Sequence, residues 1–245
     1  MVTQPERETR PGIIRAVIFD KDGTLFEFEK TWSSYCDSML DFMAAEDAPA
    51  RQILAEASGY DPVERRFRPG SPVIGSPIED ICAVWASRDP NLDLQALLDE
   101  SARVIAELRP EPVCDLQDLV AKLEAAGLAL GLVTNDLEQA ARAQLADAGV
   151  LDRFAFVSGS DSGIRTKPEP DTILAFCELT GLLPSEVAMV GDSLHDLHAA
   201  RAAGAGLAIG VLTGPAGHSD LAPRADHVLG SVMELPGLLI ERTAG

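Results

Sequence analysis

The chain has 245 residues, and its 39 acidic against 20 basic side chains give a formal net charge of −19. Hydrophobic residues make up 46% of the chain, enough to bury a core without disulfides or structural metals. So large an excess of negative charge repels the phosphates of nucleic acids and of anionic membranes, and we expect neither as a partner. The four scattered cysteines without a CxxC pair, and the lack of any stretch typical of a signal peptide or membrane helix, predict a cytoplasmic protein.

Short runs of β-branched and other apolar residues predict five buried strands. The first, IIRAVIFD, ends at Asp20, and the other four, LALGLVT, FAFVSG, VAMVGD and GLAIGVL, lie in the second half of the chain. Helical patterns alternate with these four runs, each opened by a polar residue and closed by a glycine. The opening residues are Asp115, Asp136, Asp171 and Ser193, and the glycines are Gly127, Gly149, Gly181 and Gly204. The alternation predicts a Rossmann-like α/β core in which helices cover both faces of a parallel sheet.

The stretch from residue 28 to residue 110 breaks this alternation, because it contains no convincing strand and its apolar residues recur at helical spacing. A capping box, Ser76-Pro77-Ile78-Glu79, predicts the start of one of its helices. We therefore predict a small all-helical cap domain at residues 28–110, above the carboxyl edge of a core formed by residues 12–27 and 111–245. Residues 1–11 are predicted to be a flexible N-terminus.

The first predicted strand runs directly into Asp20-Lys21-Asp22-Gly23-Thr24. The carboxylates of Asp20 and Asp22, two residues apart on an extended chain, project to the same side, and Gly23 permits a turn that a side chain would obstruct. Such a pair is costly to bury unless a cation neutralises it. Magnesium fits best, since it prefers oxygen ligands and keeps several waters. A plain turn that closes a strand is the alternative, because Asp and Gly are common turn residues.

Three further motifs follow other predicted strands. Thr134 and Asn135 end the second strand in LVTN, Lys167 lies in TKPEP after the third, and Asp192 ends the fourth in GDSLHD. Ligands of open α/β sheets bind outside the carboxyl ends of the strands, and all four motifs are expected there. Taken singly, each has a bland alternative such as a helix cap or a solvated lysine. Their joint order and placement favour one active site.

Together, DKDGT, LVTN, KPEP and GDSLHD resemble the four motifs of the haloacid dehalogenase superfamily, and most strongly those of its phosphoglycolate phosphatase-like members with a helical cap. The resemblance runs from about residue 13 to residue 229. It implies a Mg²⁺-dependent phosphatase that hydrolyses a small phosphorylated metabolite through an aspartyl-phosphate intermediate, with 2-phosphoglycolate as the leading substrate. The motifs are weakly specific for the substrate, which family members choose through the variable cap.

The resemblance implies a catalytic role for four of the motif residues. Asp20 would be the nucleophile that attacks phosphorus. Asp22 would protonate the leaving group and then deprotonate the water that hydrolyses the intermediate. Thr134 would donate a hydrogen bond to the phosphoryl oxygens, and Lys167 would supply positive charge to them and to Asp20.

The resemblance also implies which residues bind the phosphate, which bind the metal, and which orient these ligands from behind. The phosphate would be contacted by Asp20, Gly23, Thr134, Asn135 and Lys167. The Mg²⁺ ion would be held by the carboxylates of Asp20 and Asp192 and by the backbone carbonyl of Asp22. The orienting residues would be Ser193 and Asp196.

Outside the motifs, three arginines of the predicted cap, Arg65, Arg66 and Arg68, cluster in VERRFRPG. They could grip a carboxylate or a second phosphate of the substrate, and the alternative is a solvated loop. Trp32 is expected in the core of the cap rather than against the substrate. A small phosphorylated metabolite is the predicted partner, and the protein is expected to be a monomer or a homodimer.

Other functions on the same fold stay open. A 2-haloacid dehalogenase would need no carboxylate at Asp22, which argues against it. A phosphonoacetaldehyde hydrolase needs a cap lysine for a Schiff base, and Lys30, the only lysine there, lies too close to the first motif. A phosphohexose mutase would share the catalytic core. A catalytically inactive regulatory binding module would usually have lost a key carboxylate, yet none is missing.

Overall fold

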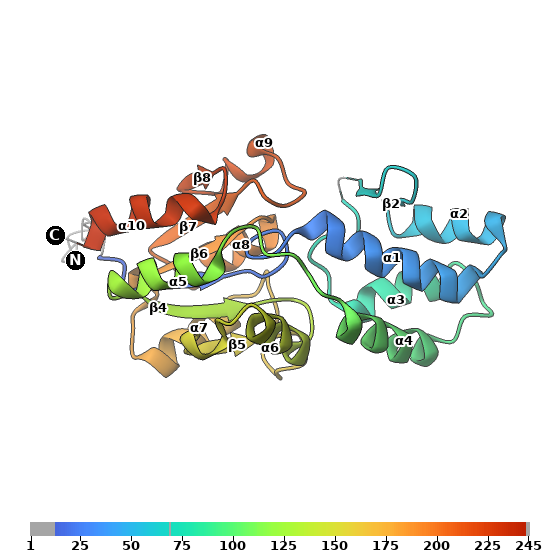
Figure 1. Ribbon diagram of the computed structural model, residues 1–245, viewed down its shortest axis with the longest axis horizontal. Coiled ribbons are helices and arrows are strands. Elements are labelled where there is room, and N and C mark those ends of the chain that lie inside the picture. The colour runs from blue at the N-terminus through green and yellow to red at the C-terminus, as the bar shows by residue number, and fades with distance from the viewer. Residues whose placement is uncertain (1–12, 69, 244–245) are drawn as a thin grey trace, which may run out of the picture.

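The computed structural model describes residues 13–68 and 70–243, so the predicted flexible segment at residues 1–11 lies outside the described residues. Within them, six parallel strands form one sheet in the order β5-β4-β1-β6-β7-β8 (Figure 1). These strands are β1 (Ala16–Phe19), β4 (Ala129–Val133), β5 (Phe156–Ser158), β6 (Val187–Gly191), β7 (Leu207–Val211) and β8 (His227–Leu229). The predicted parallel α/β fold is confirmed.

Helices cover both faces of this sheet. Alternate residues of β1 serve two layers, because Val17 and Phe19 point to one face and Ala16 and Ile18 to the other. The first face packs against α5 (Leu116–Ala125), α6 (Glu138–Asp147) and α10 (Leu235–Thr243). The second packs against α7 (Asp171–Thr180), α8 (Leu194–Ala203) and α9 (His218–Leu221). The short 3₁₀ turns of this region are Leu151–Arg153, Pro184–Glu186 and Val232–Glu234.

The ends of these helices follow local chemistry. Gly181 and Gly204 adopt left-handed φ angles of 71° and 75° and so end α7 and α8 as predicted. The predicted cap at Asp136 is wrong by one residue, because Leu137 precedes α6, which begins at Glu138. One carboxylate oxygen of Asp136 accepts instead from the next backbone N–H, and the other faces Lys21.

Residues 28–110, here called the insert, follow β1 and lie beside the sheet (Figure 1). They pack around a hydrophobic core, to which Ala140 of α6 also contributes. The helices of the insert are α1 (Phe28–Ala44), α2 (Ala48–Ala57), α3 (Ile78–Ala86) and α4 (Leu94–Glu107). Trp85 is fully buried in this core, and its Nε1 donates to the carbonyl oxygen of Leu54 at 3.1 Å. The two crossings between insert and core lie side by side, because the N–H of Glu27 donates to the carbonyl oxygen of Glu111 at 2.9 Å.

Three details correct the sequence prediction. The insert is not wholly helical, because Tyr60–Asp61 (β2) and Arg66–Phe67 (β3) form an antiparallel pair whose two-residue strands are too short to leave a pattern. The predicted capping box fails, because α3 begins at Ile78 after Pro77 and no side chain caps it. The sequence analysis also misses β8, a half-buried edge strand without the continuous apolar run of the central strands.

Helix lengths also bear on membranes. The longest helix of the described part of the chain, α1, has 17 residues and turns one face into the core of the insert. Among the described residues, no helix combines the length and the apolar character that a membrane crossing needs.

Burial predicts how two leucines on core helices differ in their contribution to stability. Leu145 on α6 is fully buried, whereas Leu179 on α7 is 62% exposed. We expect Leu145→Ala to lower the free energy of unfolding by about 2–5 kcal/mol, because it leaves a cavity between α6 and the sheet. The matched change Leu179→Ala should cost less than about 0.5 kcal/mol. Urea unfolding followed by circular dichroism measures both, and equal losses would contradict this packing.

Candidate active site

Four predicted motif residues meet at the carboxyl edge of the sheet. Asp20 follows β1, Thr134 follows β4 and Asp192 follows β6. Because β1 pairs in parallel with both β4 and β6, these three residues begin their loops at the same edge. Lys167 comes from the segment between β5 and α7, and all four side chains line a cavity of about 40 Å³.

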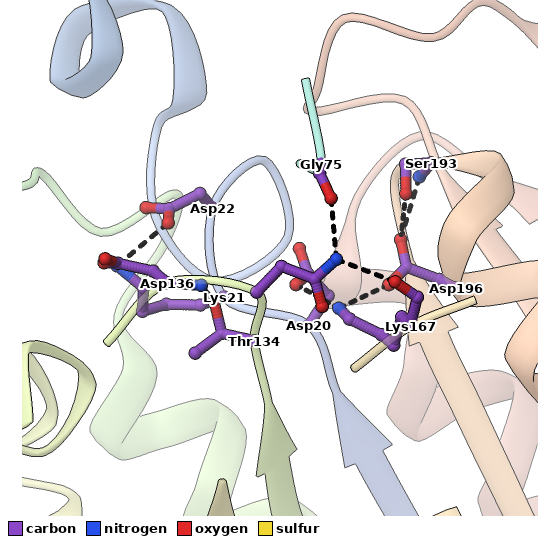
Figure 2. A network of polar contacts seen from close by, with 10 residues as sticks. Asp20, Lys21, Asp22, Gly75, Thr134, Asp136, Lys167, Ser193 and Asp196 are labelled. Atoms are coloured by element: carbon purple, nitrogen blue, oxygen red, sulfur yellow. Dashed lines mark hydrogen bonds and ion pairs between the residues drawn. The ribbon is translucent and has the colours of Figure 1, made fainter. Parts of the chain in front are cut away.

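Lys167 holds two carboxylates together (Figure 2). Its Nζ lies 2.5 Å from Asp20 Oδ1 and 2.6 Å from Asp196 Oδ1. Burial by itself lowers the pKa of Lys167, but the charges of Asp196 and Asp20 outweigh burial and hold the pKa above its usual range. The other oxygen of Asp196 accepts from the N–H of Ser193 at 3.0 Å and from its hydroxyl at 2.7 Å. Lys167 is thus a permanent cation that is fixed beside Asp20.

The carboxylates of Asp20, Asp192 and Asp196 suit a divalent cation. One oxygen of each lies within 4.8 Å of the others, and all three side chains are buried. When all are ionised, these three negative charges and the single positive charge of Lys167 leave an excess of two. Burial, partly opposed by Lys167, raises the pKa of Asp20 to about 6, and burial together with Asp20 and Asp196 raises the pKa of Asp192 well above its usual range. A divalent cation would cancel this excess, so the donor set fits one.

Two glycines make room for the Asp192 carboxylate. Gly23 has a left-handed φ of 85°, and a Cβ there would lie 2.5 Å from Asp192 Oδ2. A Cβ on Gly214 would lie 1.8 Å from the same oxygen. The resemblance implies a phosphate contact at Gly23, but its N–H donates to the carbonyl oxygen of Phe26 at 2.7 Å. In this structure Gly23 serves the turn and the close approach of Asp192, and its contact with a phosphate stays a prediction.

Thr134 and Asn135, at the end of β4, differ in what they can offer a phosphate. Thr134 Oγ1 accepts from the N–H of Asp136 at 3.1 Å, which leaves its hydroxyl proton to donate. Asn135 Nδ2 donates to the carbonyl oxygens of Gly75 at 2.6 Å and Lys167 at 2.9 Å, so both of its amide protons are used. Asn135 thus ties the insert to the core, and its buried Oδ1 has no hydrogen-bond partner among the described residues.

A second buried lysine, Lys21, lies inside the first motif and was not among the predicted site residues. Its Nζ lies 2.8 Å from Asp22 Oδ2, 2.8 Å from Asp136 Oδ2 and 2.7 Å from Gln144 Oε1. Asp22 lines the cavity, and burial raises its pKa despite the opposing charge of Lys21. The sequence did hold a signal, because a lysine that directly follows a continuous apolar strand starts from a buried position and needs partners there.

The insert contributes an apolar wall to the cavity, made by Phe28, Trp32, Val73 and Ile74. Trp32 is only 5% exposed and belongs to the core of the insert, as expected. It also faces the cavity, which the sequence analysis did not expect. Its buried Nε1 makes no direct hydrogen bond among the described residues, but the indole lies near the Asp22 carboxyl and lowers the pKa of that group against the larger effect of burial. The wall can therefore offer a ligand apolar contact and one indole N–H.

The arginine cluster does not line this cavity. Arg65, Arg66 and Arg68 are all exposed, and Arg65 pairs with Asp37 at 2.6 Å on another part of the insert. The side chain of Lys30 is likewise 60% exposed and lies outside the cavity. These positions favour the solvated alternative for the cluster.

Comparisons with known proteins agree with this geometry. The sequence model of the haloacid dehalogenase-like hydrolases matches residues 14–204. A phosphoglycolate phosphatase of Neisseria meningitidis is 30% identical over 234 residues, which cover 91% of this chain and 92% of that protein. An N-acetylmuramic acid 6-phosphate phosphatase of Pseudomonas aeruginosa is 30% identical over 195 residues, or 78% of this chain and 79% of that protein. The crystal structure of a haloacid dehalogenase-like hydrolase from Bacteroides fragilis shares the fold, with a TM-score of 0.72 and 18% identity over 91% of this chain and 99% of that one.

The acidic cluster predicts how Mg²⁺ acts on stability. The pKa of Asp20 rises from 3.8 to about 6 in the folded protein, so its contribution to stability is present at low pH and is lost as pH rises through 6. A bound cation relieves the ionised cluster, and we expect Mg²⁺ to raise the Tm more at about pH 7.5 than at about pH 5. Asp192→Asn should remove most of this effect, whereas the exposed control Asp152→Asn should keep it. Thermal unfolding with Mg²⁺ and with chelator is the measurement; equal effects at both pH values would contradict the site.

Proposed function

The chain belongs to the haloacid dehalogenase-like hydrolase family and is a phosphoric monoester hydrolase, and we propose that it uses Mg²⁺ to hydrolyse a small phosphorylated metabolite. The observation that carries the proposal is the buried contact of 2.5 Å between Lys167 and Asp20, with the Asp192 carboxylate beside it. A carboxylate alone would repel a phosphate. Placed against a buried ammonium and a site for a divalent cation, it can approach one.

In the proposed first step, an oxygen of Asp20 attacks phosphorus while the bond to the leaving oxygen breaks, which gives an aspartyl phosphate. Asp22 gives its proton to the leaving oxygen, so that an alcohol departs. Burial raises the pKa of Asp22, which favours the protonated form that this step needs. The Thr134 hydroxyl and the Lys167 ammonium would bind the phosphoryl oxygens, and their place in the lining of one cavity supports this role.

In the proposed second step, a water attacks the same phosphorus atom, Asp22 takes the proton of that water, and the bond to Asp20 breaks to release phosphate. Mg²⁺, when bound, would neutralise charge on the phosphoryl group as a Lewis acid. The Asp20 and Asp192 carboxylates and the backbone carbonyl of Asp22 would hold it, and Asp196 with Ser193 would orient them. One oxygen of Asp196 already accepts from Lys167 and the other from Ser193, which favours an orienting role over direct binding of the metal.

We propose 2-phosphoglycolate as the first substrate to test. The name of the Neisseria meningitidis relative supports it, while the Pseudomonas aeruginosa relative is named for a sugar phosphate. We also propose that residues 28–110 act as a cap domain over a core of residues 12–27 and 111–245. The cap would then choose the substrate through its apolar wall at the cavity, Trp32 included, because the arginine cluster lies elsewhere.

Other activities have less support. In a dehalogenase the buried carboxylate of Asp22 would have no role. A phosphonate hydrolase would need a lysine at the cavity, but Lys30 does not line it and pairs with Glu111 at the surface. A phosphohexose mutase would need a bisphosphate, which distinguishes it in an assay. An inactive regulatory module has no support from a site in which all four key side chains line one cavity. A cytoplasmic location and a monomeric or homodimeric state stay predictions.

Activity on p-nitrophenyl phosphate tests the proposed chemistry. Excess chelator should abolish turnover, and added Mg²⁺ should restore it. Asp20→Asn should lower kcat by about 10⁴-fold or more, because an amide cannot attack phosphorus. The exposed control Asp152→Asn should keep the wild-type rate. Full turnover in chelator, or by Asp20→Asn, would rule out the proposed mechanism.

Two substitutions in the insert test which side chains meet the substrate. Trp32→Phe removes the indole N–H that lies at the cavity near Asp22 and should lower kcat/KM for 2-phosphoglycolate by about 2- to 10-fold, the scale of one hydrogen bond. Arg68→Ala changes a side chain outside the cavity and should alter kcat/KM by less than about twofold. A large loss in Arg68→Ala that spares p-nitrophenyl phosphate would instead place the arginine cluster at the substrate.

A further inference from the structure

A buried polar network beside Asp22 has no part in the mechanism above. Lys21 Nζ donates to Asp136 Oδ2 at 2.8 Å and pairs with Asp22 Oδ2 at 2.8 Å (Figure 2). It also donates to Gln144 Oε1 at 2.7 Å. The exposed fractions of these four side chains lie between 1% and 9%. They come from three segments that are distant in sequence, namely the loop after β1, the loop after β4 and helix α6.

The surrounding oxygens fix the orientation of the Lys21 ammonium group. A lysine has three N–H groups, and three oxygens lie within 2.8 Å of Lys21 Nζ, one for each. Burial by itself lowers the pKa of Lys21, but the carboxylates of Asp136 and Asp22 outweigh burial and keep the group charged. A charged and saturated group that cannot reach water fixes the positions of the groups it binds.

The two oxygens of Asp22 lie in different surroundings. Oδ2 is held by Lys21, whereas Oδ1 is buried and accepts no direct hydrogen bond among the described residues. The indole of Trp32 lies near this carboxyl and lowers its pKa against the larger effect of burial. Asp22 lines the same cavity as Asp20 and Lys167. Because an unpaired carboxylate oxygen is costly to bury, Oδ1 is placed for an oxygen that a ligand brings. By holding one oxygen, Lys21 leaves the other for the ligand.

We propose that Lys21 is a positioning residue, which orients Asp22 so that Oδ1 reaches first the leaving oxygen and then the attacking water. This inference rests on the proposed function, because it assumes the two proton transfers of Asp22. In the first, a proton moves from Asp22 to the leaving oxygen as the bond between that oxygen and phosphorus breaks. In the second, a proton of the water moves to Asp22 as the water oxygen bonds to phosphorus. Lys21 transfers no proton, and Asp136 and Gln144 hold Lys21 in place.

Leaving-group dependence separates positioning of an acid from a purely structural role. An alkyl phosphate such as 2-phosphoglycolate needs a proton on its leaving oxygen, whereas p-nitrophenolate leaves without one. Because kcat/KM covers the steps up to departure of the leaving group, we expect Lys21→Met to lower it about 10²-fold for the alkyl phosphate and less than about threefold for p-nitrophenyl phosphate. The second proton transfer is common to both substrates, so phospho-enzyme should accumulate, with a burst of p-nitrophenolate equal to the enzyme present.

Further variants separate a loss of positioning from a loss of the fold. Lys21→Met leaves the Asp136 carboxylate buried without its cation, so the double variant Lys21→Met with Asp136→Asn removes both charges and should show the same selective loss. Gln144→Leu removes one partner of Lys21 and should show the same pattern at smaller size. Lys122→Met is the matched control, because this lysine forms an exposed pair with Asp118, and its kinetics should not change.

Two results would overturn the assignment of Lys21. Equal losses of kcat/KM on both substrates by the folded double variant would show a structural role, and wild-type kinetics would show no role. Neither result touches the proposed function. A wild-type protein that releases no phosphate from either ester in Mg²⁺ would contradict the proposed function itself.

Discussion

The contact between the Lys167 ammonium and the carboxylates of Asp20 and Asp196 is the interaction on which the site depends. The contact joins three segments of the chain, namely the end of β1, the segment before α7 and the first turn of α8. Each segment contributes one charged group, and each of these groups is neutralised only by a group from another segment. Burial raises the pKa of Asp20 to about 6 even with Lys167 in place, so the cluster is anionic only at a cost in stability. The remaining excess of negative charge is what makes this edge of the sheet a place for a divalent cation.

A second ammonium repeats this arrangement on the other side of the first motif. Lys167 faces Asp20, whereas Lys21 faces Asp22, so that each aspartate of the motif has its own buried lysine. Only four lysines occur in the chain, and two of them lie here. Both act over less than 3 Å in a place with little water, where a charge is felt far more strongly than the net charge of −19 on the protein as a whole. An acidic protein can therefore still present a site suited to phosphate.

The sequence predicted the sheet and the meeting of its motifs at one edge because both depend on strong local signals. Strands buried on both faces leave continuous apolar runs, and the ends of parallel strands must meet at one edge. Weaker signals failed where contacts made by tertiary structure decide the outcome. Asp136 resembles a helix cap, but a buried ammonium 115 positions away in sequence claims one of its oxygens. The hairpin Tyr60–Phe67 has strands too short to leave a periodicity, and the side of the insert on which the arginines lie is fixed by packing that no local pattern encodes.

The position of the insert and the arrangement of the cavity residues depend on shared contacts. Asn135 donates its two amide protons to the carbonyl oxygens of Gly75 in the insert and of Lys167 in the core. One side chain therefore contacts both parts of the molecule. A Cβ on Gly75 would meet the ring of His195 at 2.9 Å, which shows how closely the insert approaches the first turn of α8. If the insert moved away, Asn135 would lose a bond and Trp32 would leave the cavity together with the apolar wall. The proposed selection of the substrate by the insert and the placement of charge by the core therefore depend on the same few contacts.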